Sequence, residues 1–376
     1  MPRRRVIVWG PGEVGAAVIA GVLADRDLEL VGVKAFNPAK EGRDAGELVG
    51  VGPCGVLVTC SSEDLLTIDA DVVVLSCAAS ALDQDLDADV IAMLQSGKNV
   101  IATVGYHHVA RSNPMSKRRQ SPQRLQQAAL AGNASLYGAG VHPSYMTERV
   151  AMTLAAGLGD VEHIRTIEAL DFSGAPADMW GGLAAIGFGS DPGSISSDNM
   201  LARYGDMYYG DTVANLAFSL TGSDNVRIEN QVFGRPATSR MELPTITIEE
   251  GTVGALHLVT KAFVGSACVA TNEEVWFLGA PNAFRGDDLP FENWNQGLVA
   301  YTIEVSSKAT KLRAQLEYEL LQLHNPVTQM SVRAVIDAIG PVCDAEPGVL
   351  IDDATPRVRR DPRVGVSPES PGGYAT

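Results

Sequence analysis

Three glycines at a fixed spacing are the residues of this chain best suited to binding a ligand. Gly10, Gly12 and Gly15 form a G-x-G-x-x-G segment between the apolar run 6–9 and a stretch with apolar residues at helical spacing. Between a strand and a helix, such glycines permit a tight turn, a close approach of backbone N–H groups to a pyrophosphate, and close helix–strand packing. A second apolar run, 28–35, follows after one helix length. The pattern therefore predicts a dinucleotide-binding turn rather than an unliganded glycine-rich turn.

The end of the second predicted strand bears on which dinucleotide binds. An NAD-selective site usually carries Asp or Glu there, to bind the ribose 2′-hydroxyl. This chain instead has Lys34, followed by Lys40 and Arg43. Two cations in the following loop could bind a 2′-phosphate, so we expect NADP(H), with NAD(H) as the alternative. Taken singly, Lys40 and Arg43 could equally be solvated surface charges.

Further predicted strands, 72–77, 99–103 and 135–138, end in segments that should face the same crevice. In a parallel sheet, ligands bind at the carboxyl ends of the strands. The predicted cofactor contacts are Gly10, Pro11, Gly12, Glu13, Val14, Gly15, Asn37, Lys40, Arg43, Ser76, Cys77, Ala78, Thr103, Gly105 and Val141.

The same segments contain side chains capable of proton transfer. Tyr106, His107 and His142 are the candidate catalytic residues, because histidine titrates near neutral pH and these loops should flank the nicotinamide. Each could instead be a surface or structural residue. The candidate substrate contacts are Tyr145, Asp171 and Trp180.

Alternating strands and helices predict an α/β fold with a Rossmann-type, doubly wound parallel sheet over the first 140 residues. Strand-like runs clustered later in the chain predict an α+β second domain with a mixed or antiparallel sheet. The expected domains are 1–141 together with 326–354 for the dinucleotide, and 142–325 for substrate and oligomerisation. Residues 355–376 form an expected mobile tail, since prolines and glycines there leave little to bury.

Composition excludes several classes. The 376 residues are 45% apolar, which suits two globular domains, and carry a net charge of −16 without a basic stripe. Nucleic-acid and anionic-membrane partners are therefore not expected. Five scattered cysteines lack metal-ligand spacing and indicate neither a disulfide framework nor a metal site. Without an apolar signal core or a spanning segment, we expect a cytoplasmic protein.

Three segments carry a resemblance to a known family. They are the glycine turn with Asp44-Ala45-Gly46-Glu47-Leu48 after it, Gly138-Ala139-Gly140-Val141-His142-Pro143-Ser144-Tyr145, and Ala345-Glu346-Pro347-Gly348. The first resembles the N-terminal domain of dihydrodipicolinate reductase. Together they are more similar to the related 2,4-diaminopentanoate dehydrogenases and NAD(P)H-dependent amine dehydrogenases. The resemblance implies a nicotinamide cofactor, a homodimer built through the second domain's sheet, and hydride transfer to a C=N bond or its reverse.

Two departures from the family narrow the expected function. The stretch 167–174 lacks the His-His pair and Lys that handle substrate in dihydrodipicolinate reductase, which argues against lysine biosynthesis. The segment 103–108 lacks the Glu that amine dehydrogenases of the group tend to carry after the fifth strand. We expect an NADP(H)-dependent oxidoreductase acting on an amine, imine or carbonyl substrate. The alternatives are a carbonyl reductase and a cofactor-binding sensor or scaffold without catalysis.

Overall fold

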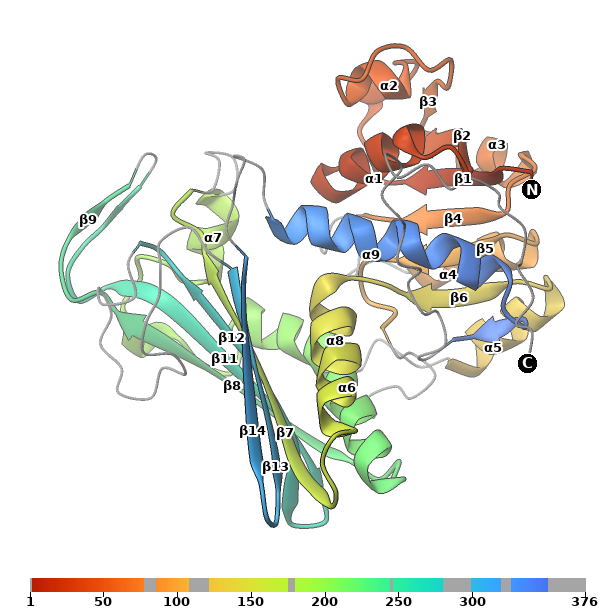
Figure 1. The fold of residues 1–376 in the computed structure, drawn as a ribbon. Coiled ribbons are helices and arrows are strands. Elements are labelled where there is room, and N and C mark those ends of the chain that lie inside the picture. Colours follow the sequence, from red (N-terminus) through yellow and green to blue (C-terminus); the bar gives the residue numbers. More distant parts are fainter. Residues whose placement is uncertain are drawn as a thin grey trace, which may run out of the picture.

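The computed structural model describes residues 2–77, 86–107, 122–174, 180–243, 246–279, 299–318 and 326–350 (Figure 1). They form a seven-stranded parallel sheet and a six-stranded mixed sheet, each with helices packed against it. The predicted fold class is thereby confirmed. Within this part of the chain, no helix combines the length and the apolar character that crossing a membrane requires.

The first sheet has the strand order β15-β6-β5-β4-β1-β2-β3, with every pair parallel. Its strands are β1 (Arg4–Trp9), β2 (Leu28–Lys34), β3 (Val58–Thr59), β4 (Val72–Leu75), β5 (Asn99–Ala102), β6 (Ser135–Gly138) and β15 (Gly348–Val349). The central strand β4 is entirely apolar and fully buried, as expected of a strand covered on both faces.

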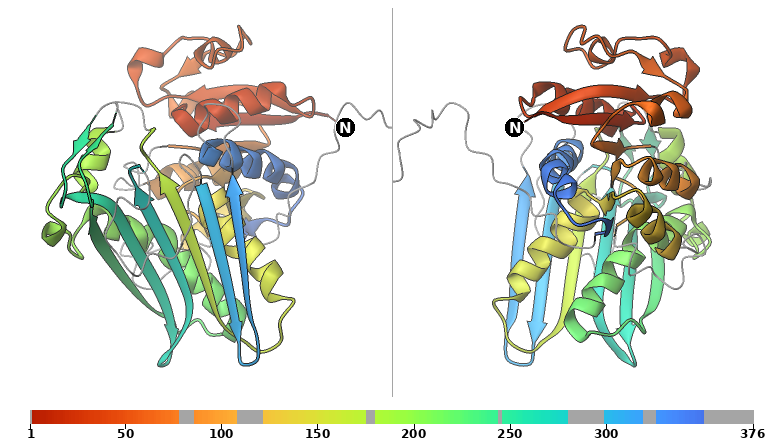
Figure 2. Two further views of the ribbon diagram at one scale, coloured as in Figure 1. Left: turned by 60° about the vertical axis from the view of Figure 1, so that its left-hand side comes forward. Right: turned by 90° about the vertical axis from the view of Figure 1, so that its right-hand side faces the viewer.

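Helices cover both faces of this sheet (Figure 2). On one face, α1 (Glu13–Ala24) packs against α9 (Pro326–Cys343) in a shared apolar core. On the other lie α4 (Leu86–Gln95) and α5 (Pro122–Ala131). The shorter α2 (Ala45–Leu48) and α3 (Ser62–Thr67) connect strands at the β3 edge. Helix α9 and strand β15 come from the far end of the chain, so both ends of the sequence build this unit.

The segment Val141–Val150 connects the two sheets. His142, Pro143 and Ser144 have non-helical backbone angles there, and the chain then continues into α6 (Ala151–Ala155). Helical structure ends at Ala155. The non-helical turn matters because it directs His142 from the first sheet toward the second.

The second sheet has the order β14-β13-β7-β12-β11-β8. Its strands are β7 (Val161–Asp171), β8 (Arg227–Pro236), β11 (Val253–Val264), β12 (Ala267–Phe277), β13 (Val299–Ser307) and β14 (Lys311–Tyr318). Strands β7 and β12 are parallel and the other neighbours antiparallel. Helices α6 and α8 (Met200–Thr221) pack on one face. Helix α7 (Trp180–Ile186) and the hairpin of β9 (Met241–Glu242) and β10 (Thr247–Ile248) lie at one end.

Candidate active site

A cleft of about 480 Å³ lies at the carboxyl ends of the first sheet's strands. It is lined by Gly10, Pro11, Gly12, Glu13, Val14, Ala35, Phe36, Asn37, Lys40, Ser76, Cys77, Thr103, Val104, His107, Gly140, His142, Pro143, Tyr208 and Ser331. Segments after five strands, β1, β2, β4, β5 and β6, therefore meet in one place, together with residues from α8 and α9. This is where a doubly wound sheet binds its ligand.

The glycine turn has the geometry that a pyrophosphate needs. Gly10 has a φ of +104°, which favours glycine, and a Cβ on Gly15 would lie 2.0 Å from the Gly10 carbonyl oxygen. Gly12, by contrast, has open space where a Cβ would be. It precedes the first turn of α1, and no side chain caps that end of the helix. The N-terminal N–H groups of α1 are therefore available to an anion, and the residues present fit a dinucleotide.

The end of β2 presents a cation to this turn. The Lys40 Nζ donates a hydrogen bond to the Pro11 carbonyl oxygen at 2.6 Å, which holds the ammonium group beside the glycine turn. Asn37 also lines the cleft, and its side chain accepts a hydrogen bond from the Ala39 N–H. Lys34 is buried instead, with its Nζ donating to the Cys60 carbonyl oxygen and lying 4.5 Å from the centre of the Phe36 ring.

Asp44, from the family-like segment, organises the loop behind Lys40. Its carboxylate accepts hydrogen bonds from four backbone N–H groups, those of Gly46, Glu47, Cys54 and Gly55. These bonds lower the pKa of Asp44 to about 2, and the bond from the Cys54 N–H has the largest effect. The carboxylate therefore shapes this loop and does not act in proton transfer near neutral pH.

His142 connects the cleft to a cluster of buried acids in the second sheet. Its side chain is 1% exposed, and its Nε2 lies 2.5 Å from Oε1 of Glu274. Glu274 lies opposite Glu168 on the neighbouring strand, with a carboxylate oxygen of each within 4.8 Å of the other. Glu168 Oε1 accepts a hydrogen bond of 2.7 Å from the Tyr301 hydroxyl. The rings of Tyr209 and Tyr301 lie 5.4 and 5.5 Å from the imidazole, centre to centre.

Strand register explains how these side chains meet. Glu168 on β7 is directly paired with Glu274 on β12 and with Tyr301 on β13. The three therefore form one row across neighbouring strands, on the face that α8 covers. The next row adds Asn272, whose amide donates to Glu274 Oε1 at 2.6 Å. Two carboxyl groups directly opposite each other on neighbouring strands would repel if both were charged.

Burial determines the protonation of this cluster. Burial away from water raises the pKa of Glu168 to about 8, and it raises the pKa of Glu274 to about 8 as well. Burial also lowers the pKa of His142, in spite of nearby Glu168 and Glu148. The favoured state near neutral pH is therefore a neutral imidazole beside carboxyl groups that retain a proton.

Comparison with known proteins agrees with the predicted resemblance. Residues 4–118 match the family model "Dihydrodipicolinate reductase, N-terminus". An amine dehydrogenase from Streptomyces virginiae is 33% identical over 173 residues, 44% of this chain and 46% of that protein. A 4-hydroxy-tetrahydrodipicolinate reductase from Synechocystis is 36% identical over 63 residues, 17% of this chain and 23% of that protein. The chain thus matches less than half the length of either relative.

Among solved structures, the amine dehydrogenase from Mycobacterium smegmatis has the same fold over nearly the whole chain. The TM-score is 0.68, with 19% identity over 96% of this chain and 98% of that one. A probable dehydrogenase from Thermotoga maritima gives a TM-score of 0.53 at 15% identity, with 93% and 92% covered. The likeness in fold therefore extends over both sheets, and not only over the first.

Twelve of the predicted site residues line the cleft. They are Gly10, Pro11, Gly12, Glu13, Val14, Asn37, Lys40, Ser76, Cys77, Thr103, His107 and His142. Gly15 lies behind Gly10, where helix α1 packs on β1. Arg43 is exposed and does not line the cleft, Gly105 occupies the turn after β5, and Val141 is packed against β13. Ala78 lies outside the described residues.

Tyr106 lies away from the cleft, contrary to its prediction as a catalytic neighbour of the nicotinamide. Its ring is 2% exposed within the core between the sheet and α4, and its hydroxyl donates to Asp87 at 2.7 Å. His107, the next residue, does line the cleft.

The three predicted substrate contacts are spread out. Tyr145 lines a separate small cavity with Tyr137 and Arg149. Asp171 is the last residue of β7, and its carboxylate accepts hydrogen bonds from the backbone N–H groups of Ser173 and Gly279. Trp180 is buried in the apolar core beneath α7. The structure does not bring these three together with His142.

Sequence reasoning missed Glu168, Glu274 and Tyr301. Each lies on a strand of the second sheet, and a polar residue in an otherwise apolar strand-like run was the available signal. Distances among His142, Glu168 and Glu274 would also permit a metal ion, since one potential donor atom from each lies within 4.8 Å of the others. Hydrogen bonds from Tyr301 and Asn272 already satisfy carboxylate oxygens of this cluster, and the sequence predicted no metal.

Proposed function

We propose that the protein is an NADP(H)-dependent oxidoreductase that transfers a hydride to or from a carbon–nitrogen bond. One observation carries the proposal: His142 lines the dinucleotide cleft and is hydrogen-bonded to a buried acid of the second sheet. Bound NADP(H) would supply or accept the hydride at this cleft. The chain itself supplies the cradle for the cofactor and a group that exchanges protons beside it.

The loop after β2 supports NADP(H) over NAD(H). Lys40 is fixed beside the glycine turn, and the cleft residues contributed by the end of β2 and the loop after it are Ala35, Phe36, Asn37 and Lys40, none of them acidic. A 2′-phosphate beside Lys40 would form a charge-assisted hydrogen bond, whereas a 2′-hydroxyl lacks its usual carboxylate acceptor.

The acid cluster supports a nitrogen substrate over an alcohol or ketone. Among the described residues, Glu168 and Glu274 have no ion pair with Lys or Arg, and His142 is their one basic contact. A buried acid cluster without a fixed cation favours a ligand that can carry positive charge. An amine or imine nitrogen can become positively charged by taking a proton from the acid cluster. A carbonyl oxygen is far less basic.

Ammonia dependence tests this function. Ketones and aldehydes of varied size are incubated with NADPH, with and without ammonium, and amines are incubated with NADP+ in the reverse direction. We expect nicotinamide oxidation that requires ammonium, and a chromatographically identified amine product. Turnover of a carbonyl substrate without ammonium would establish carbonyl reduction instead. Tight NADPH binding with no turnover across both panels would favour a cofactor-binding sensor.

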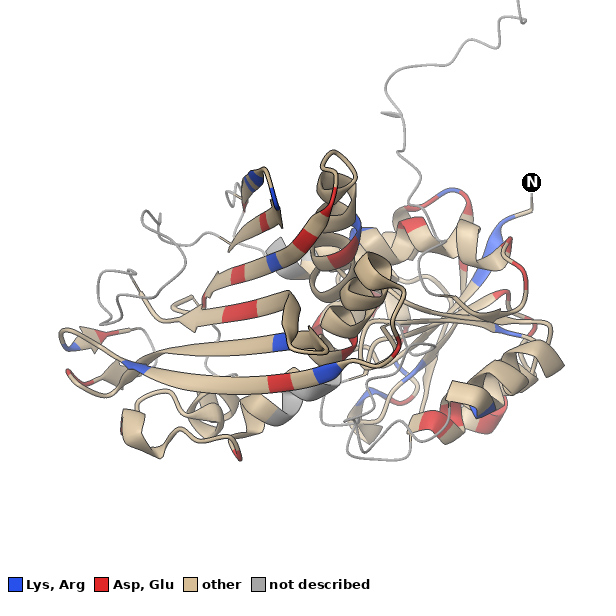
Figure 3. Ribbon diagram, turned by 90° about the horizontal axis from the view of Figure 1, so that it is seen from below, with Lys and Arg blue, Asp and Glu red and all other residues tan. Residues whose placement is uncertain are grey.

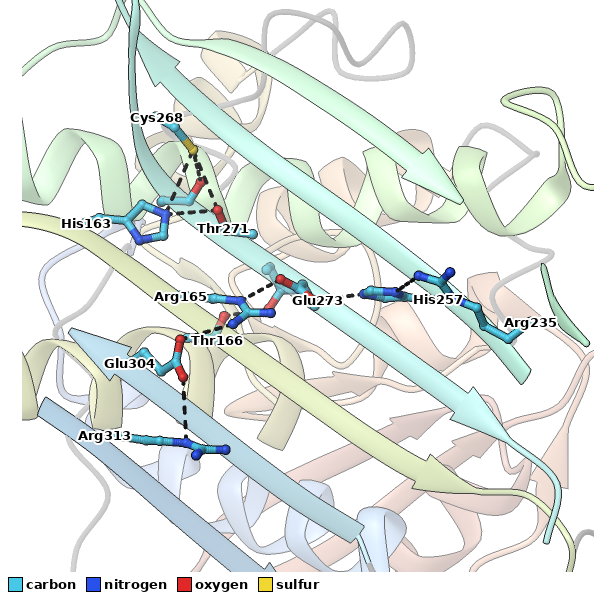
Figure 4. Close-up of polar contacts among 12 residues, drawn as sticks. His163, Arg165, Thr166, Arg235, His257, Cys268, Thr271, Glu273, Glu304 and Arg313 are labelled. Atoms are coloured by element: carbon cyan, nitrogen blue, oxygen red, sulfur yellow. Dashed lines mark hydrogen bonds and ion pairs between the residues drawn. The ribbon is translucent and has the colours of Figure 1, made fainter. Parts of the chain in front are cut away.

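We also propose that the protein is a homodimer formed through the face of the second sheet opposite α8. Arg165, Glu273 and Glu304 form ion pairs on this face, and His257 links Glu273 to Arg235 (Figure 4). Acidic and basic residues are interspersed along these strands (Figure 3). A surface of mixed charge can be complementary to itself across a two-fold axis.

A further inference from the structure

A row of neighbouring polar side chains leads from the cleft into the second sheet. It runs from His142 through Glu274 and Glu168 to the Tyr301 hydroxyl, and its four members come from four different segments of the chain. At the cleft end, His142 Nδ1 is buried and makes no hydrogen bond to any residue that the structure describes. Glu274 Oε2 likewise has no such partner, but of these four residues only His142 lines the cleft, so its Nδ1 is the atom that we assign to a ligand there.

We propose that His142 exchanges a proton with the substrate nitrogen, and that Glu168 and Glu274 together hold the proton that resupplies it. This inference rests on the proposed function. It assigns the proton chemistry to the second sheet, and not to a carboxylate after β5, where this chain has Thr103 and Val104. His142 is then a catalytic residue, and Glu168, Glu274 and Tyr301 act through it.

Charge and register explain why the pair does not give up both of its protons near neutral pH. The carboxyl groups face each other from paired positions on β7 and β12, and both are at most 4% exposed. The titratable groups facing them are His142 and Glu148 from the segment after β6, Tyr209 from α8 and Tyr301 from β13. None of these is a permanent cation. Two bare carboxylates here would repel strongly in a medium of low dielectric, and a shared proton removes the repulsion.

The proton balance for a neutral imine is simple. When the imine carbon gains a hydride, the C=N π electron pair moves to nitrogen, which then needs one proton. The Nδ1–H of His142 donates it, Nε2 takes a proton from Glu274, and Glu274 takes one from Glu168. The carboxyl pair, which starts with a proton on each group, is left with one shared proton and recovers the other from solvent after product leaves. Amine oxidation runs the same transfers in reverse.

The first test uses the protein without cofactor and measures unfolding by denaturant against pH. Because burial raises the pKa of both carboxyls, the folded pair keeps protons that the unfolded chain releases. Stability from this source is fully present below the unfolded pKa near 4.5 and is lost as pH rises through about 8. We expect Glu168→Gln to reduce the slope of unfolding free energy against pH, between about pH 5 and about pH 8, by roughly one proton.

The second test is steady-state kinetics with the amine or imine substrate found above. We expect Glu168→Gln, Glu274→Gln and His142→Asn each to lower kcat by about 100-fold or more, the usual contribution of a proton-transfer group. For Glu168→Gln and Glu274→Gln the Kd for NADPH should change by less than about twofold, since neither residue lines the cleft. Tyr301→Phe, the mildest change, should shift the basic limb of the pH–rate profile. Glu162→Gln, an exposed position on the same strand β7, is the matched control and should retain wild-type behaviour.

The outcomes separate the two proposals. Full kcat and an unchanged unfolding slope in Glu168→Gln would overturn the proton relay while leaving the amine chemistry intact. A wild-type protein that binds NADPH but turns over no nitrogen substrate would overturn the proposed function, and the unfolding slope would still report on the shared proton. Stoichiometric divalent metal in the purified protein, lost with Glu274→Gln, would show a metal site and also refute the relay.

Discussion

At the scale of single residues, Lys40 has the clearest measurable role. Replacing Lys40 with Ala removes the cation beside the glycine turn, so we expect NADPH affinity to fall by roughly 10- to 100-fold, the value of one charge-assisted hydrogen bond. NADH affinity should change little, because NADH has no 2′-phosphate. Titration of tryptophan fluorescence with each cofactor measures both constants.

Arg26→Ala is the matched control for this substitution. Arg26 lies in the turn between α1 and β2 with its side chain 90% exposed, and it is not among the residues that line the cleft. Its replacement should leave both affinities unchanged. An equal loss of NADH and NADPH affinity in Lys40→Ala would show that Lys40 supports the turn through Pro11 and does not select the phosphate.

At the scale of elements, alanine substitutions at two glycines of one turn should impair different properties, stability in one case and cofactor binding in the other. A Cβ at position 15 would overlap the Gly10 carbonyl and push α1 away from β1, so Gly15→Ala should lower stability by about 1–3 kcal/mol. A Cβ at position 12 meets open space, so Gly12→Ala should unfold at the wild-type denaturant concentration but bind NADPH more weakly. Unfolding curves and cofactor titrations on both variants check this. Normal stability in Gly15→Ala would contradict the packing argument.

How much of the site could be predicted from sequence depends on whether its geometry is local. The glycine turn is local, because spacing within one strand–turn–helix determines it. The acid row is not local: Glu168 meets Glu274 and Tyr301 only through the register of three strands, which no short pattern encodes. The edge strand β14 also escaped prediction, because its alternating charged and apolar residues lack the continuous apolar run of a buried strand.

At the scale of the whole molecule, the two sheets contribute different parts of one site. The first sheet builds the cofactor cradle, and the second contributes the acids behind His142. Helix α9, from the far end of the chain, completes the wall of the cleft. Its Thr328 hydroxyl donates a hydrogen bond to the Glu13 carboxylate at 2.9 Å, and its Ser331 lines the cleft. Neither sheet alone would hold both a dinucleotide and the proton path.

The proposed dimer can be tested on the open face of the second sheet. Phe233 lies there beside His257 and is 39% exposed, unusual for a large apolar side chain on a strand. Light scattering after size exclusion should give about twice the chain mass of 39.7 kDa for wild type and a monomer for Phe233→Glu. Leu130→Glu, an exposed apolar position on α5 of the other domain, should remain dimeric. A monomeric wild type at micromolar concentration would refute the interface, whereas a dimer that Phe233→Glu leaves intact would place it elsewhere.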